Sequence, residues 1–386
     1  IFMKIGILTL PYKSNYGGIL QCVALQNVLA EEGHEVEVIR YVPREHSGIL
    51  RRMVMVMSSF SSCREFFCYI KDCYKTFYKK RRLQQQAPSS QLLSNCQEFI
   101  DEQIRYSPIV HEENIAFLAS RYDAIVVGSD QVWTGLGQKQ LIYLFDWSPA
   151  YEGLRVSYAA CSANAHVPRF ATSKIKRKLQ QFDALSVRDE NTCRLVRQCS
   201  GVWPSVVADP TLLYDFGTLL KAPFVKEPYI FCYILGGEIQ GGHKQVIDEI
   251  KKEYGDMPVV AVALPDCTLE AGDFADRIIT DASPGMWLNL LAHSAFVYTD
   301  SFHGCIFSIK YQKKFLAYYT YAQRASRLMD LKKRYALNHI VVESVAEMLT
   351  NESIRKNADY SVINPLVKKY QTESFDFLRT SLHTLK

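Results

Sequence analysis

Short apolar runs alternate with amphipathic segments along the first part of the chain. An apolar run at 3–10 is followed by a polar, glycine-rich loop at 11–18 and by a segment of helical spacing at 19–33. A second apolar run follows at 34–42. Strands that alternate with helices in this way are typical of a parallel sheet with helices on both faces. The opening of the chain is therefore predicted to be a βαβ unit.

The alternation continues and then starts again. Further strand-like runs lie within 122–133, 155–164 and 201–215, and the pattern resets near 217–228. A second series of apolar runs and helical segments then occupies 228–337. Two such series in one chain predict two α/β domains.

We therefore expect two Rossmann-like domains that face a cleft, an arrangement called GT-B-like. The expected bounds are 1–222 for the N-terminal domain and 223–386 for the C-terminal domain. The segment 364–385 has helical spacing and is expected to pack back across the domains. The fold alone implies no function.

Residues 49–106 interrupt this rhythm and are predicted to form a helical insertion in the first domain. Within them, 49–83 mixes many Lys and Arg residues with Met, Phe, Tyr and Cys. Basic residues beside bulky apolar ones suit an anionic membrane surface. Two interpretations stay open: peripheral contact with the inner membrane, or a solvated helical pair or dimer contact.

Composition narrows the class of protein. The chain has 386 residues, 48% hydrophobic and 22% charged, as expected of a globular protein. A net charge of +5 is too small for a dedicated nucleic-acid binder and suits an anionic small ligand or membrane surface. Eleven cysteines without a CxxC pair indicate neither a zinc ribbon nor a disulfide framework. We expect a cytoplasmic protein with reduced thiols, without a signal peptide or membrane span.

Polar residues follow four of the predicted strands, where α/β proteins bind ligands. After the first strand, the paired glycines of Asn15-Tyr16-Gly17-Gly18 let backbone N–H groups approach an oxygen-rich ligand. The second polar group suits a sugar, and its Asp130 can accept a proton from a hydroxyl. It contains Ser129, Asp130, Gln131 and Trp133. The alternatives are a tight turn for the first group and a helix cap with a core Trp for the second.

The other two strand ends are basic. Arg188 follows the third, and its planar fork suits a phosphate or carboxylate unless it pairs with Asp189 to hold the turn. The fourth contains Ser301, Phe302, His303 and Gly304 at the start of a predicted helix. A helix N-terminus attracts anions, and an anion beside His303 favours the protonated imidazole, a usable general acid. The alternative is a structural histidine.

Seven segments match a known family in order and spacing. They are "NYGGILQCVALQ", "GSDQVW", "SYAACSA", "SVRDE", "ADPTLL", "VYTDSFHGCIFSIKYQKKF" and "RASRLMDL". With them, the chain resembles the polysaccharide pyruvyl transferase family over most of its length. The resemblance implies a GT-B-like fold and transfer of a pyruvyl group from phosphoenolpyruvate to two hydroxyls of a sugar, which forms a cyclic ketal. It implies His303 as the acid and Arg188 as a ligand of the donor anion.

One position departs from the family pattern. Some members have an Arg two residues before the histidine, where this chain has Ser301, and we expect Arg324 and Arg327 to take its place. The catalytic candidates are then His303 and Asp130. The donor-binding candidates are Arg188, Ser301, Phe302, Gly304, Arg324 and Arg327. The acceptor-binding candidates are Asn15, Tyr16, Gly17, Gly18, Ser129, Gln131 and Trp133.

The expected partners are phosphoenolpyruvate, as donor substrate, and a sugar of a surface polysaccharide or of its lipid-linked precursor. No cofactor, metal or nucleic acid is expected, and a homo-oligomer is left open. Two other functions stay open as alternatives. One is a nucleotide-sugar glycosyltransferase of the same architecture, and the other is a non-catalytic binding or scaffold protein with a degenerate site.

Overall fold

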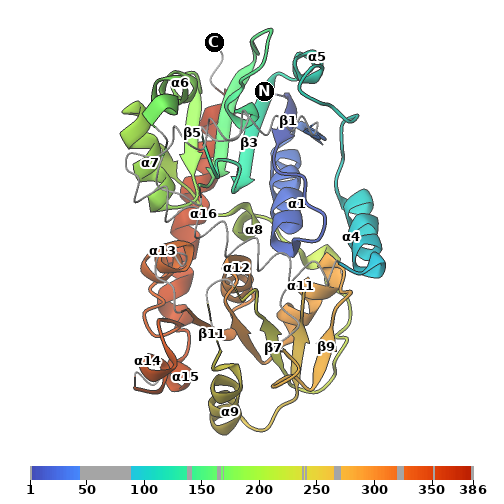
Figure 1. Ribbon diagram of the computed structural model, residues 1–386, viewed down its shortest axis with the longest axis vertical. Helices are drawn as coiled ribbons and strands as arrows, with labels where there is room; N and C mark the ends of the chain where they lie inside the picture. The colour runs from blue at the N-terminus through green and yellow to red at the C-terminus, as the bar shows by residue number, and fades with distance from the viewer. Residues whose placement is uncertain are drawn as a thin grey trace.

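Two six-stranded parallel sheets form the core of the protein. The computed structural model describes residues 2–43, 88–136, 141–162, 167, 169–236, 239, 241–264, 271–319, 326–350 and 353–383. Within these ranges the two sheets lie one above the other along the long axis, with helices packed around them (Figure 1). The predicted class, two Rossmann-like α/β domains, is confirmed.

The first sheet has the order β2-β1-β3-β4-β5-β6. Its strands are β1 (Lys4–Leu8), β2 (Glu35–Val38), β3 (Ala124–Asp130), β4 (Leu154–Ala160), β5 (Ala184–Val187) and β6 (Ser205–Val206). From β1 the chain moves outward to β2 and then returns to β3 on the other side of β1, where Ile7 pairs with Val126. In open α/β sheets, ligands bind at such a reversal, which here lies at the carboxyl ends of β1 and β3.

The second sheet has the order β12-β11-β10-β7-β8-β9. Its strands are β7 (Ile230–Tyr233), β8 (Val259–Val262), β9 (Arg277–Ile279), β10 (Phe296–Thr299), β11 (Lys314–Tyr318) and β12 (Val341–Val342). Here the reversal lies between β7 and β10, whose residues Tyr233 and Thr299 pair at the carboxyl ends. The expected domain boundary at 222/223 falls between β6 and β7.

Helices cover both sheets. In the N-terminal domain they are α1 (Tyr16–Glu31), α4 (Ser90–Gln103), α5 (Ile115–Ala119), α6 (Arg169–Leu179), α7 (Glu190–Ser200) and α8 (Pro210–Leu213). In the C-terminal domain they are α9 (His243–Tyr254), α11 (Pro284–His293), α12 (Phe302–Lys310), α13 (Ser326–Arg334), α14 (Val345–Thr350), α15 (Ser353–Lys356) and α16 (Tyr360–His383). None of these described helices is long and apolar enough to cross a membrane. Of the predicted insertion, 49–87 lies outside the described residues.

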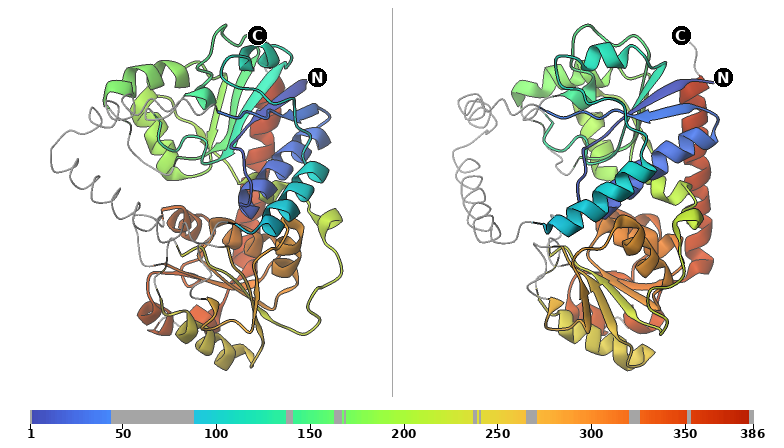
Figure 2. Two further views of the ribbon diagram at one scale, coloured as in Figure 1. Left: turned by 45° about the vertical axis from the view of Figure 1, so that its right-hand side comes forward. Right: turned by 90° about the vertical axis from the view of Figure 1, so that its right-hand side faces the viewer.

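Helix α16 ties the two domains together, as predicted for the C-terminal segment. It runs alongside both domains (Figures 1 and 2). At its start, the Tyr360 hydroxyl donates to the Lys313 carbonyl of the second domain, at 2.6 Å. Farther along, Ser374 Oγ accepts from the Ala208 backbone N–H of the first domain, at 2.8 Å.

The apolar core also continues from one domain into the other. Tyr16, at the start of α1, is completely buried, and its ring stacks on Trp287 of α11 with centroids 5.8 Å apart. Tyr233 of β7 packs against the same two rings. The first turn of α1 is thus fixed against the second domain, which places the carboxyl ends of both sheets together.

Candidate active site

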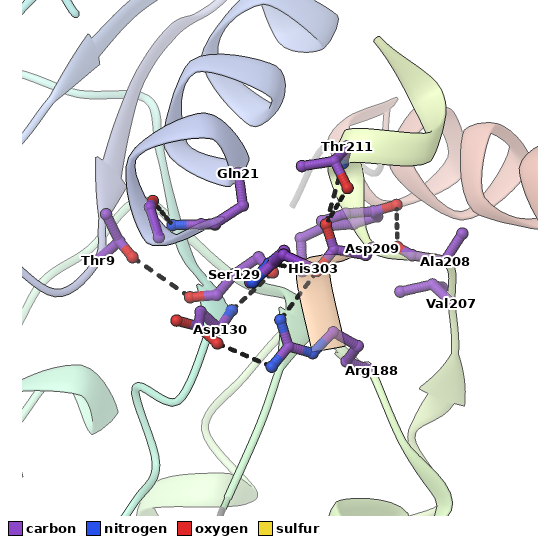
Figure 3. Close-up of polar contacts among 12 residues, drawn as sticks. Thr9, Gln21, Ser129, Asp130, Arg188, Val207, Ala208, Asp209, Thr211 and His303 are labelled. Atoms are coloured by element: carbon purple, nitrogen blue, oxygen red, sulfur yellow. Dashed lines mark hydrogen bonds and ion pairs between the residues drawn. The ribbon is translucent and has the colours of Figure 1, made fainter. Parts of the chain in front are cut away.

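Five polar side chains meet where the strand ends of the two domains converge. Figure 3 shows four of them, Asp130, Arg188, Asp209 and His303. Each of the five comes from the carboxyl end of a strand or from the segment just after it. They are Tyr12 after β1, Asp130 at the end of β3, Arg188 after β5, Asp209 after β6, and His303 after β10. The first four belong to the N-terminal domain, and His303 is brought by the C-terminal domain.

Arg188 lies at the centre of this group. Its Nη2 is 2.7 Å from Asp130 Oδ1, and its Nη1 is 2.8 Å from Asp209 Oδ2. The guanidinium carbon lies 4.3 Å from the centroid of the Phe302 ring, and the residue is 1% exposed. We predicted a fork open to a ligand anion or, as the alternative, a pair with Asp189. Instead, both terminal nitrogens bind carboxylates that are distant in sequence, because a buried cation needs counter-charges.

Asp130 is held from two sides. Arg188 binds one carboxylate oxygen, and the Tyr12 hydroxyl donates to the other at 2.7 Å. Burial, the largest single influence, acts to raise the pKa of Asp130, but the charge of Arg188, the nearby His303 and Arg327 and the bond from Tyr12 together lower it. Burial and the charge of Asp130 raise the pKa of Tyr12, so its hydroxyl stays a donor.

Asp209 uses its two oxygens for different tasks. Oδ1 caps α8 by accepting from the Thr211 backbone N–H at 3.0 Å and from its hydroxyl at 2.7 Å. Oδ2 faces Arg188 and lies 3.5 Å from His303 Nε2. Burial acts to raise the pKa of Asp209, but interactions with His303 and Arg188 lower it well below its usual range. The carboxylate is therefore ionised at neutral pH.

His303 lies in the first turn of α12, which Ser301 caps by accepting from the Gly304 N–H at 3.3 Å. The residue is 6% exposed. Nε2 is buried and makes no hydrogen bond of normal geometry within the described part of the chain. A Cβ on Gly17 would lie 2.1 Å from His303 Nδ1, so only glycine lets α1 pack this closely against the imidazole.

The charges of this group do not cancel. Two carboxylates and one guanidinium leave one negative charge directly beside the imidazole of His303. A protonated imidazole would neutralise it. An ionised carboxylate beside a histidine is an arrangement found in sites of general acid–base catalysis, and here Asp209 is that carboxylate.

The sequence model of the family described as "Polysaccharide pyruvyl transferase" matches residues 15–321. The matched span contains Asp130, Arg188, Asp209 and His303. The chain belongs to the polysaccharide pyruvyl transferase family. It is therefore a transferase, and the predicted family is confirmed.

Solved structures of similar fold have low sequence identity. The UDP-GlcNAc 2-epimerase from Methanocaldococcus jannaschii in complex with UDP-GlcNAc and UDP is 12% identical, with 98% of this chain and 100% of that chain covered and a TM-score of 0.49. S. aureus MnaA with UDP is 14% identical, with coverages of 95% and 91% and a TM-score of 0.45. The spinosyn rhamnosyltransferase SpnG is 13% identical, with coverages of 99% and 100% and a TM-score of 0.46. No curated protein sequence matches the chain.

Among the residues predicted to bind the acceptor, Trp133 needs a correction. We expected its ring to face a sugar, but the side chain is completely buried and its Nε1 donates to the Tyr143 carbonyl at 3.2 Å. It packs against Phe182 in the core below the sheet end. Tyr16 is likewise buried in the domain contact. Neither ring is open to a ligand.

The remaining acceptor candidates lie around the strand ends. Asn15 caps α1 by accepting from the Gly18 N–H at 3.0 Å, and Gly18 packs against the Tyr12 ring. Ser129 is buried and its hydroxyl accepts from the Asp130 N–H at 2.6 Å. Gln131 is half-buried and lines a mostly apolar cavity of about 190 Å³. Asn15 and Gln131 are the polar side chains of this set that keep some exposure.

The residues predicted to bind the donor also differ in their surroundings. Arg327 lies in the first turn of α13 and is half-buried. Burial is the largest influence on Asp130 and acts to raise its pKa, whereas the charge of Arg327 helps to lower it. Arg327 therefore lies near the buried charges. Arg324 lies outside the described residues. Gly304 is required for packing, because a Cβ there would lie 2.4 Å from Thr299 Oγ1.

The sequence interpretation missed two members of this group of five polar side chains, Asp209 and Tyr12. Asp209 stands in the segment "ADPTLL", where an Asp before a Pro after a strand is a helix-cap signal. That signal predicts only the use of Oδ1, and the contact of Oδ2 with His303 arises from the domain arrangement. Tyr12 had no signal of its own. No cluster of metal-ligand type is found among the described residues.

Proposed function

We propose that this family member transfers a pyruvyl group from phosphoenolpyruvate to two hydroxyls of one sugar, in a surface polysaccharide or its lipid-linked precursor. The observation that carries the proposal is the contact between His303 and the ionised Asp209 at the carboxyl ends of both sheets. This contact supplies a proton donor with its counter-ion where α/β domains bind substrates.

The proposed reaction begins with proton transfer. His303 gives a proton to the methylene carbon of phosphoenolpyruvate, which leaves an electrophilic centre at the neighbouring carbon. One sugar hydroxyl adds there, and the bond to the phosphate oxygen breaks so that phosphate leaves with the electron pair. The second hydroxyl adds to the same carbon and closes the ketal. Of the two protons released by the hydroxyls, one returns to His303 and one leaves with phosphate or solvent.

The donor is an anion and needs positive partners. We propose that the N–H groups of the first turn of α12 and the side chain of Arg327 bind its phosphate and carboxylate. Arg188 is already bound by Asp130 and Asp209, so we propose that it acts by positioning these two carboxylates. This division of roles fits a chain in which Ser301 stands where some family members have an Arg.

The acceptor sugar is proposed to bind on the side of the N-terminal domain, at Asn15, Gly17 and Gln131. Asp130 would orient or deprotonate a hydroxyl. Although each of its oxygens already accepts one hydrogen bond, a carboxylate oxygen has a second lone pair. Peripheral membrane contact through 49–83 remains a prediction about residues outside the described ranges, and a cytoplasmic location remains a prediction as well.

Donor binding tests the proposal without knowledge of the acceptor. We would measure thermal unfolding of the wild type, His303→Gln and Arg327→Ala with phosphoenolpyruvate, UDP or GDP. A ligand at about 100 times its Kd stabilises a protein by about 2.7 kcal/mol. We expect phosphoenolpyruvate alone to stabilise the wild type, with a smaller shift for Arg327→Ala. Stabilisation by a nucleotide and not by phosphoenolpyruvate would contradict the proposal and favour a glycosyltransferase.

Transfer itself is then measured with a panel of sugars. Release of inorganic phosphate and a new ketal methyl signal in the proton NMR spectrum are the expected results for the wild type. His303→Gln should bind the donor and release no phosphate. A variant that lacks His303 and still forms the ketal would remove the proposed acid from the mechanism.

A further inference from the structure

The two ring nitrogens of His303 have different surroundings. Nε2 is buried, makes no hydrogen bond of normal geometry, and lies 3.5 Å from Asp209 Oδ2. Nδ1 lies at the edge of the ring that packs over Gly17. A Cβ added to Gly17 would be 2.1 Å from Nδ1. Nε2 therefore faces the carboxylate of Asp209. Nδ1 faces Gly17, which has no side chain.

We propose that Asp209 is the positioning residue of His303, which holds Nε2–H so that Nδ1 is the nitrogen that exchanges a proton with the substrate. This inference rests on the proposed function, because it assigns the proton transfer to one atom of the proposed acid. The imidazolium gives its Nδ1 proton to the methylene carbon. The neutral ring that remains keeps its other proton on Nε2, toward Asp209, until a sugar hydroxyl restores the proton at Nδ1.

Asp209 is well suited to this task because its own orientation is fixed. Two bonds from Thr211 hold Oδ1, and Arg188 Nη1 holds Oδ2 at 2.8 Å. The carboxylate therefore cannot turn away from His303 without breaking the cap of α8. A carboxylate that accepts from one nitrogen of a histidine sets the tautomer and leaves the other nitrogen for chemistry.

The distance of 3.5 Å is long for a hydrogen bond. Hydrogen bonds of catalytic groups are often long without substrate and shorten in the complex. Shortening of the contact between Nε2 and Asp209 Oδ2 is also favourable, because a buried polar atom without a hydrogen-bond partner lowers stability by about 1–3 kcal/mol. Asp209 is the acidic group that faces it.

The test uses nitrogen NMR of the histidine rings in the full chain, which needs no substrate. The chain has nine histidines, and loss of one signal pair in His303→Gln assigns this ring. At a pH where the ring is neutral, the protonated and the bare nitrogen have well-separated shifts. We expect the wild type to carry the proton on Nε2. We expect Asp209→Asn to move it to Nδ1, because the amide group of Asn donates toward Nε2.

The matched control is Asp189→Asn. Asp189 caps α7 in the same way that Asp209 caps α8, by accepting from the Thr192 N–H at 2.8 Å and from its hydroxyl at 3.0 Å. Asp209→Asn keeps an oxygen for the Thr211 bonds, so both variants retain a capping group. Asp189→Asn should leave the tautomer of His303 unchanged. A tautomer change in both variants would indicate a general loosening and would contradict the specific role.

Each result decides the inference. A wild-type ring with its proton on Nδ1, or an Asp209→Asn ring with the wild-type tautomer, would overturn it even if pyruvyl transfer is confirmed. If transfer is measurable, we expect kcat to fall by up to about 10⁴-fold in Asp209→Asn, the loss known for an Asp-to-Asn change that imposes the wrong tautomer on a catalytic histidine, with the KM for the donor nearly unchanged. An Asp209-dependent tautomer without any binding of phosphoenolpyruvate would instead leave the positioning role in place and remove the proposed donor.

Discussion

The most constrained contact of the site joins a glycine of one domain to the histidine of the other. Gly17 is buried in the first turn of α1, and its missing side chain is what lets the imidazole of His303 lie there. The residue after the histidine, Gly304, likewise makes room for the side chain of Thr299. At this scale, the site requires the backbone of α1 to lie close to the imidazole ring of His303.

Gly17→Ala should lower both stability and activity. In an ordinary helix, Gly to Ala is favourable by up to about 1 kcal/mol. Here the new methyl group overlaps His303, and overpacking costs about 1–3 kcal/mol. Thermal unfolding and pyruvyl transfer are the measurements, and Gly272→Ala is the control because nothing lies within 4 Å of its Cβ position. A Gly17→Ala protein as active as the wild type would show that the ring does not need this position.

The buried charges should make stability depend on pH. Burial acts to raise the pKa of Asp130 in the folded state, but Arg188 and its other polar neighbours together lower it, while an unfolded Asp titrates near pH 3.9. A carboxyl with a lowered pKa contributes stability above its unfolded value, and this contribution is lost as the pH falls through the folded value.

Asp130→Asn should therefore be destabilised most at neutral pH, by about 3–5 kcal/mol, because it removes one partner of a buried ion pair. The difference from the wild type should shrink as the pH falls below about 4. Denaturant unfolding at several pH values measures it. Asp256→Asn, whose side chain is 92% exposed, is the control and should show little change at any pH. A difference for Asp130→Asn that is constant with pH would contradict the assignment of charge.

At the scale of elements, α16 connects the two domains outside the site. It contacts the first domain through a buried bond, from the Ala208 N–H to Ser374 Oγ, and through an exposed one, between Arg379 and Glu32 at 2.7 Å. Loss of the buried contact should reduce stability more than loss of the exposed one, because water can take the place of a lost partner only at the exposed contact.

Ser374→Ala should destabilise the protein by about 1–3 kcal/mol, since it leaves the buried N–H of Ala208 without its acceptor. Arg379→Ala should change the unfolding free energy little, because solvent and salt screen its contact with Glu32. Thermal or denaturant unfolding of both variants provides the comparison. A larger effect from Arg379→Ala would mean that the exposed pair holds the helix.

At the scale of the molecule, the two domains share one continuous hydrophobic core. Tyr16 of the first domain and Trp287 of the second are both completely buried against each other, together with Tyr233. Domains that bury large aromatic side chains in common are expected to unfold together. The site between them is then assembled only in the intact fold.

Calorimetry should show one unfolding transition. Trp287→Ala should move the whole transition to lower temperature, because large-to-small substitution of a buried Trp costs about 3–5 kcal/mol. Trp203→Ala is the control, since this residue is 64% exposed and stacks on Arg197 at the surface. Two separate transitions in the wild type would show that the domains are independent.

Much of the architecture was predictable because its signals are local. The alternation of short apolar runs with helical spacing reflects which residues face a sheet or a helix, and it predicted both parallel sheets. Ser301 before His303 was recognisable as a helix start, and Asp209 before Pro210 has the same kind of signal. The positions of Asp130, Arg188 and His303 at strand ends followed from the same pattern.

The sequence by itself thus determined the fold class, the family and most residues near the strand ends. Only the tertiary structure decided what those residues touch. Arg188 binds Asp130, 58 residues away, and Asp209, 21 residues away, and Trp133 turns into the core although it stands three positions after Asp130. The physical reason is that a buried charge selects its partners by distance in space and by the cost of desolvation, and no local pattern of side chains encodes either quantity.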